Sequence, residues 1–148
     1  MAHRTQPDTP PRTLGLNHVN LVVADVERSV EFYRRGLGLE LDKVTDEITF
    51  LTTPGIGDSL ALQLAGGPLD LVSGKTRTPG DSGGVDHIGF DVPDAATLNT
   101  LVAATVAAGG TEIMRTSEDD TPTAFIADPD GYLIQLTARY AGAVCSTA

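Results

Sequence analysis

The sequence predicts an α+β fold made of two similar modules, each with one strand, one helix and three further strands. The main observation is an internal repeat, because LNHVNLVVAD (16–25) aligns without gaps with VDHIGFDVPD (85–94). Self-similarity of this kind indicates a duplicated supersecondary unit. A second observation is that apolar residues alternate in short segments and recur every third or fourth residue in longer ones. At 148 residues, the chain suits one domain with a substantial core.

A helix is expected after each copy of the repeat. In the first copy Asp25 is the predicted N-cap, and Gly38 ends the helical pattern of residues 26–38. In the second copy Asp94 is the predicted N-cap, and Gly109 ends the helix. The apolar residues expected on one face of these helices are Val26, Val30, Tyr33 and Leu37, and then Leu98, Leu101 and Val102.

Three strands follow each helix, and the last pair closes through a turn rich in Pro, Gly and Asp. The expected strand segments are 39–47, 48–55 and 59–66, and then 111–119, 123–131 and 131–138. The predicted organisation is a flexible tail (1–15), module one (16–69), a linker (70–84), module two (85–139) and a C-terminal tail (140–148).

Polar residues gather on one face of the predicted sheets. Since side chains alternate faces along a strand, His18 and Asn20 lie opposite the apolar Val19 and Leu21. The repeat places His18 on His87, and it places two glutamines at equivalent positions on the last strand of each module. Four side chains that can bind a metal or hydrogen-bond a ligand therefore share the polar face; they are His18, Gln63, His87 and Gln135.

Composition excludes several classes of partner. The net charge of −10 argues against nucleic acid, which requires a basic surface. No apolar run is long enough to cross a bilayer, and MAHRTQPDTPPRT has no apolar signal-peptide core, so we expect a cytoplasmic protein. Cys145 is the only cysteine, so no internal disulfide can form.

The stretch LNHVNLVVADVERSVEFYRRGLGLEL (16–41) resembles the opening of a vicinal-oxygen-chelate protein. VDHIGFDVPD and AFIADPDGYLIQL resemble the second-module strand and terminal hairpin of the same superfamily. That superfamily includes glyoxalase I, methylmalonyl-CoA epimerase, extradiol dioxygenases, and fosfomycin and bleomycin resistance proteins. The resemblance implies two βαβββ modules forming a cupped mixed sheet around a site, a small-molecule ligand and a homodimer.

The resemblance also implies a divalent metal ion (Fe, Mn, Zn, Ni or Co) held by His18, Gln63, His87 and Gln135. Most metal-binding members have Glu at the last of these positions, and glyoxalase-like members have Glu at the second. Glutamine is neutral, so we expect weaker metal affinity and a bound ion that keeps its full charge. Such an ion would stabilise an oxyanion or enolate.

Gln135 cannot act as a base, so a base must come from elsewhere. The candidate catalytic residues are Asp91, on the polar face, and Glu47 or Asp46, at the entrance to the third strand. The candidate substrate-binding residues are Asn20, Phe50, Phe125 and Thr137.

Two functions remain open on the sequence. One is a metal-dependent lyase, isomerase or dioxygenase acting on a small molecule, which retention of four potential ligands favours. The other is a metal-free protein of the bleomycin-resistance type that sequesters a drug, which the missing carboxylate and the acidic composition favour. Fosfomycin transferase activity is the less favoured form of antibiotic resistance, because the Glu ligand is absent.

Overall fold

The structure is a computed structural model that describes residues 13, 15–67, 77–81, 83–118 and 120–138. Most of the predicted tail at 1–15, part of the predicted linker, the C-terminal tail and Cys145 lie outside the described residues. The predicted module boundaries stay predictions.

The first module has the predicted order of strand, helix and three strands. Its sheet has the order β1-β4-β3-β2, in which β1 is parallel to β4 and the other neighbours are antiparallel. Its elements are β1 (Val19–Val23), α1 (Val26–Leu37), β2 (Glu40–Val44), β3 (Ile48–Thr52) and β4 (Leu60–Leu64).

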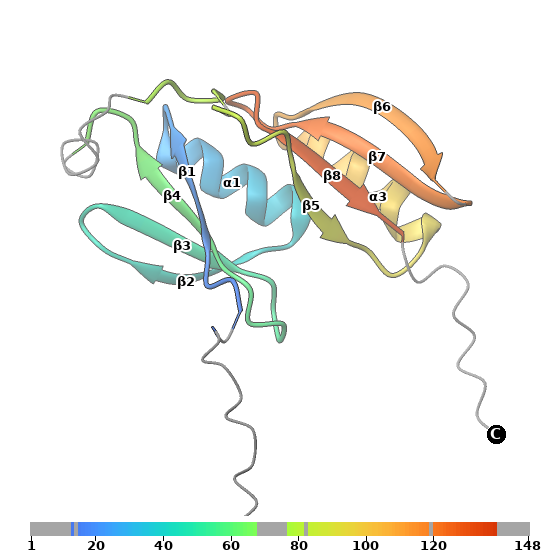
Figure 1. Cartoon of the computed structure of the whole chain (residues 1–148), viewed down its shortest axis with the longest axis horizontal. Helices are drawn as coiled ribbons and strands as arrows, with labels where there is room; N and C mark the ends of the chain where they lie inside the picture. The colour runs from blue at the N-terminus through green and yellow to red at the C-terminus, as the bar shows by residue number, and fades with distance from the viewer. Residues whose placement is uncertain (1–12, 14, 68–76, 82, 119, 139–148) are drawn as a thin grey trace, which may run out of the picture.

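The second module repeats this topology in a sheet of order β5-β8-β7-β6 (Figure 1). Both helices lie on the same side of the two sheets, behind them in Figure 1. The predicted α+β fold of two βαβββ modules is therefore confirmed, with the strands in two four-stranded mixed sheets. The elements of the second module are β5 (Ile88–Asp91), α3 (Ala95–Ala107), β6 (Thr111–Glu118), β7 (Thr121–Ala127) and β8 (Leu133–Thr137).

The helix ends are set by short-range chemistry. Asp25 and Asp94 each accept a hydrogen bond from the backbone N–H three residues on, as predicted for N-caps. Gly38 ends α1 in the left-handed conformation (φ 74°), while α3 ends at Ala108, one residue before the predicted Gly109. Among the described residues, no helix is long and apolar enough to span a membrane.

The buried face of α1 includes the predicted stripe and extends beyond it. Tyr33 is fully buried as expected, and Val26, Val30 and Leu37 are half-buried and pack against the core. The other fully or largely buried residues of the helix are Ser29, Phe32 and Gly36. The physical reason is that α1 packs against α3 as well as against its own sheet. A Cβ on Gly36 would lie 2.9 Å from Thr105 Cγ2 of α3, so a glycine permits this close approach.

Apolar side chains of both sheets form one core beneath the helices. Leu21, Val23, Leu51, Leu62, Ile126, Ile134 and Leu136 are among the residues of this core. Leu64 alternates along β4 with the buried Leu60 and Leu62, but it is the last residue of the strand and is 48% exposed. Ala61 and Gln63 are instead buried on the opposite face, so this face of β4 is covered.

A polar clamp, made of Arg28, Tyr33, Asp128 and Asp130, joins the two modules. The Tyr33 hydroxyl donates a 2.7 Å hydrogen bond to Asp128 Oδ2. Arg28 Nη2 lies 2.8 Å from Asp130 Oδ1, and the Ala24 N–H donates to the same oxygen at 3.2 Å. Burial raises the pKa of Asp128, and burial together with the nearby Asp128 raises the pKa of Tyr33.

The two aspartates of the clamp lie in the turn between β7 and β8. Asp128 Oδ1 accepts hydrogen bonds from the backbone N–H groups of Asp130, Gly131 and Tyr132, each at 2.9 Å. Gly131 has φ of 100°, a conformation that glycine adopts without strain. The sequence-predicted turn is thus confirmed, and its two carboxylates also hold the other module.

Candidate functional site

In module one, four candidate residues form two contacting pairs. The exposed His18 precedes β1, and its ring packs edge-on against Phe50 with ring centroids 5.8 Å apart. Asn20 Nδ2 donates a 2.8 Å hydrogen bond to Gln63 Oε1, which fixes the orientation of the Gln63 amide. Gln63 is 6% exposed, so its carbonyl oxygen is held in a largely buried position.

Module two repeats this group with one change. His87 packs edge-on against Phe125, with ring centroids 5.6 Å apart. Gln135 of β8 pairs with Gly89 of β5, the residue that the repeat aligns with Asn20. A Cβ on Gly89 would lie 3.9 Å from Gln135 Oε1, so the amide lies over the glycine. The described residues provide no hydrogen bond that fixes the Gln135 amide.

Both imidazoles are oriented by the residue that precedes them. His18 Nδ1 lies 2.6 Å from Asn17 Oδ1, and His87 Nδ1 lies 2.6 Å from Asp86 Oδ2. An amide or carboxylate oxygen can only accept, so each Nδ1 carries the proton. The lone pair of each Nε2 is then free to coordinate, as in metal-ligating histidines held through their other nitrogen. Asn17 and Asp86 orient the two imidazoles and were not among the predicted site residues, although the repeat aligns them.

The four predicted ligands are divided between two cavities and the sheets: His18 lines one cavity and His87 the other, and neither cavity is lined by Gln63 or Gln135. Imidazole nitrogens and amide oxygens are both metal donors, and neither carries negative charge. Within the described ranges, no group of three or more His, Cys, Asp or Glu side chains could hold a metal. A metal held by the predicted ligands would therefore need amide oxygens as donors in addition to imidazole nitrogens.

Two cavities lie between the edge strands β1 and β5. The first, of about 190 Å³, is lined by His18, and the second, of about 260 Å³, by His87 and Asn20. The cavities are related by the internal repeat, since equivalent residues line them. His18, Val19, Ser59, Leu60 and Ile88 in the first correspond to His87, Ile88, Gly131, Tyr132 and Val19 in the second.

The second cavity is more polar and is bridged by a tyrosine. Tyr132 donates a 2.7 Å hydrogen bond from its hydroxyl to the carbonyl oxygen of Val22 in β1. Arg77 and Asp81, which precede module two, also line this cavity. Tyr132 was not among the predicted site residues; it aligns with Leu60 and breaks the symmetry of the repeat.

The candidate bases lie on the surface. Asp91 is exposed at the end of β5, directly opposite Thr137 of β8. Glu47 is exposed in the turn between β2 and β3, where its backbone N–H donates to Thr45 Oγ1 at 3.3 Å. Asp91 is therefore on the sheet that carries His87 and Gln135, and Glu47 is in the other module.

The arrangement described above can be compared with known proteins. A sequence model of the Glyoxalase/Bleomycin resistance protein/Dioxygenase superfamily matches residues 15–136. The chain belongs to this superfamily. The resemblance seen in the sequence is thereby confirmed. No curated protein sequence matches the chain.

Solved structures of this superfamily share the fold. A glyoxalase-related enzyme from Fulvimarina pelagi has a TM-score of 0.69 and 23% identity, over 84% of this chain and 88% of that chain. A glyoxalase/bleomycin resistance protein from Albidiferax ferrireducens T118 has a TM-score of 0.64 and 24% identity, over 82% and 96%.

Fosfomycin resistance proteins also share the fold. FosX of Listeria monocytogenes, a Glu-to-Gln variant complexed with Mn(II) and 1S,2S-dihydroxypropylphosphonic acid, has a TM-score of 0.65 and 17% identity. The match covers 86% of this chain and 91% of FosX. At these identities the likeness concerns the fold alone.

Proposed function

We propose that this member of the superfamily is a metal-dependent enzyme of the lyase, isomerase or dioxygenase type that acts on a small molecule. His18, Gln63, His87 and Gln135 would hold the divalent ion. The observation that carries the proposal is the duplicated orientation of the imidazoles, each held through Nδ1 by the preceding residue at 2.6 Å. An imidazole with a merely structural role does not require its Nε2 to be kept available in both copies.

The chain's own residues would position the substrate. A divalent ion in this site would supply a positive charge that stabilises an oxyanion or enolate. Phe50 and Phe125 pack on the two imidazoles and restrict the space around them. Asn20 and Thr137 are proposed to orient polar groups of the substrate, and Asp91 or Glu47 to accept its proton.

The alternative is a metal-free protein that sequesters a cationic drug. The net charge of −10 and the lack of a carboxylate among the four donors favour it. Asp81 and Asp86, which line the second cavity, would then face the cation.

Metal analysis of protein purified without chelator separates the two functions. We expect a divalent ion at substoichiometric amounts, and binding in calorimetric titrations with Mn²⁺, Fe²⁺, Zn²⁺, Ni²⁺ and Co²⁺. His18→Ala and His87→Ala should each abolish binding. His3→Ala is the matched control, because this third histidine lies outside the repeat.

Protein that binds none of these ions contradicts the proposed enzyme. A rise in melting temperature of that metal-free protein with a cationic antibiotic would then support the sequestering alternative, since a ligand stabilises the folded state by mass action.

We also propose a homodimer. The edge strands β2 and β6 carry exposed apolar side chains, which a partner surface could cover; they are Leu41, Val44, Ile113 and Met114. Light scattering coupled to gel filtration would measure the mass, and a monomer at all concentrations contradicts this part of the proposal.

A further inference from the structure

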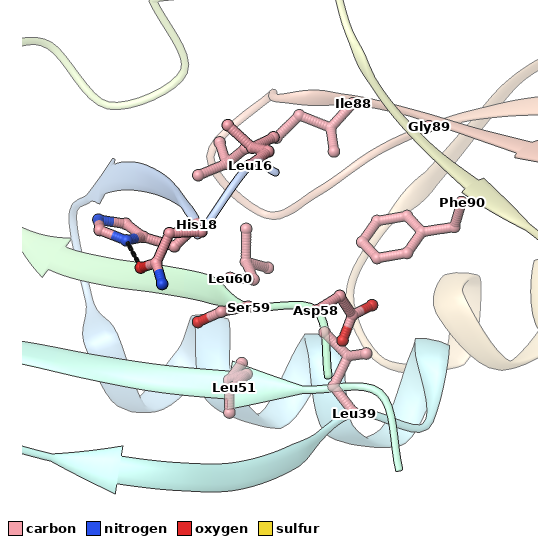
Figure 2. Close-up of a pocket in the computed structure, with 12 residues that line it drawn as sticks. Leu16, His18, Leu39, Leu51, Asp58, Ser59, Leu60, Ile88, Gly89 and Phe90 are labelled. Atoms are coloured by element: carbon pink, nitrogen blue, oxygen red, sulfur yellow. Dashed lines mark hydrogen bonds between the residues drawn. The ribbon is translucent and has the colours of Figure 1, made fainter. Parts of the chain in front are cut away.

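The first cavity is walled mainly by apolar side chains from both modules. Figure 2 shows the Phe90 ring pointing from β5 toward Leu60. Leu39, Leu51 and Leu60 are at most 5% exposed, so the cavity reaches into the edge of the core. Leu16 and Ile88 line it as well.

The charged and titratable groups in this wall already have partners. Asp58 Oδ1 accepts the Thr53 N–H at 2.6 Å, and Asp58 Oδ2 accepts the Thr53 hydroxyl at 2.7 Å. His18 turns its ring away from the apolar wall and bonds Asn17 through Nδ1 (Figure 2). The inner part of the cavity is therefore suited to an apolar group, because a polar group placed there would lose its bonds to water.

The two modules have diverged at the residue that matters most for this space. Tyr132 occupies the second-module position equivalent to Leu60, and its hydroxyl reaches Val22 across the gap between β1 and β5. Leu60 is shorter than a tyrosine and makes no such bridge. The first cavity is thus apolar, whereas the equivalent cavity of the second module is more polar and is bridged by the tyrosine.

We propose that this cavity binds an aromatic ring or a branched alkyl group of a small molecule. An apolar cavity of about 150 Å³ lined by Leu, Ile and Phe binds benzene, so a space of about 190 Å³ is large enough. Because the exposed His18 also lines this cavity, the remaining part of that molecule would lie beside the proposed metal site. Only this last step rests on the proposed function; binding of the apolar group does not.

The test uses fluorobenzene as the probe and metal-free full-length protein, followed by ¹⁹F NMR titration. Wild-type protein should bind fluorobenzene saturably. Leu60→Tyr inserts the residue of the other module and should weaken binding by about tenfold or more, since a pocket discriminates strongly against lost volume. Leu64→Tyr is the matched control: it makes the same change on the same strand at a 48% exposed residue, and should leave affinity unchanged.

Phe90→Leu keeps the proposal testable if Leu60→Tyr fails to fold by circular dichroism. Leucine is the repeat-equivalent residue, Leu21, and the smaller side chain should raise affinity for 1-fluoronaphthalene relative to fluorobenzene. Absence of saturable binding, or equal effects of Leu60→Tyr and Leu64→Tyr, overturns the proposal. Repeating the fluorobenzene titration with Mn²⁺ separates the two proposals. If fluorobenzene binds saturably but Mn²⁺ does not change its binding, the result counts only against the proposed enzyme.

Discussion

Tyr33 and Asp128 join the two modules through a 2.7 Å hydrogen bond from the phenol to the carboxylate. They are 95 residues apart in the sequence, one on α1 and the other in the turn between β7 and β8. Tyr33 is 0% exposed and Asp128 is 4% exposed, so water cannot replace the bond without local opening. The bond therefore contributes both to stability and to the relative placement of the modules that form the cavities.

Removal of the Tyr33 hydroxyl should destabilise the fold. Tyr33→Phe leaves one oxygen of a buried carboxylate without its donor, and we expect a loss of about 1–3 kcal/mol in the free energy of unfolding. Urea denaturation followed by circular dichroism measures this change. Tyr132→Phe is the comparison, since it removes a half-buried bond to a neutral carbonyl and should cost about 1 kcal/mol. Equal stability of Tyr33→Phe and wild type would contradict the role of the clamp.

The same tyrosine should make the protein sensitive to alkali. Burial raises the pKa of Tyr33 well above 10.0, so the folded state keeps a proton that the unfolded chain loses. Its contribution is fully present below pH 10.0 and is lost as the pH rises through the folded-state value. Denaturation curves at increasing pH should show a steeper alkaline decline for wild type than for Tyr33→Phe. Parallel declines would show that another group is responsible.

The contribution of Asp128 to the free energy of unfolding should decrease as the pH rises from acid values. Burial raises its pKa above 3.8, so the folded state binds a proton more tightly than the unfolded chain. This contribution is fully present below pH 3.8 and is lost as the pH rises through the raised value. The stability of wild type relative to Asp128→Asn should therefore fall as the pH rises above 3.8 and through the raised pKa. A difference that is constant across this range excludes Asp128 as the titrating group.

A single methyl group should test the contact between the helices. Gly36→Ala would normally stabilise a helix, but here the new Cβ would lie 2.9 Å from Thr105 Cγ2 and 3.0 Å from Thr105 Cα. We expect a net loss of about 1–3 kcal/mol from overpacking, measured by thermal and urea denaturation. Thr105→Ser removes the nearer atom, keeps the hydroxyl that bonds Val102, and should partly restore Gly36→Ala. Stabilisation by Gly36→Ala alone would contradict this packing.

Addition of a carboxylate should strengthen metal binding at one position. Gln135→Glu supplies the charge that the donor set lacks, and we expect at least a tenfold gain in Mn²⁺ affinity, or about 1–3 kcal/mol. Isothermal titration calorimetry measures the affinity. Thr137→Glu is the control, because it adds the same charge two residues along the same face of β8. An equal gain in both variants would mean that Gln135 acts through general charge and does not coordinate.

The fold was largely predictable because its signals are local or repeated. Asp25 and Gly38 mark the first helix by capping chemistry alone, and the repeat predicts the second module from the first. The buried Gly36 was missed because it packs against Thr105 of α3, and the buried Ser29 was missed because it contacts Asp130 of the other module. The hydrophobic period of a single helix does not report contacts of this kind. Asp128 was interpreted as a turn residue only. The available signal was that the equivalent Pro-Gly turn of module one lacks this aspartate, so the turn itself does not require it.

The candidate site was predictable in residue types and less so in surroundings. His18 and His87 were found by alignment of the two copies, as were the two glutamines. The partners of the imidazoles, Asn17 and Asp86, lie one residue away but differ in type, so neither was recognised. The apolar cavity depends on how two strands distant in sequence approach each other, and no local pattern encodes that distance.

The hydrogen bonds made by Asp130 and Tyr132 also protect an edge strand from aggregation. As an outer strand of its sheet, β1 would offer main-chain groups to which a foreign strand could attach. The carboxylate of Asp130 occupies the Ala24 N–H, and the phenol of Tyr132 occupies the Val22 carbonyl. Side chains from the other module thus hinder the pairing of a foreign strand with β1. Separation of the modules would expose this strand edge and favour fibre formation.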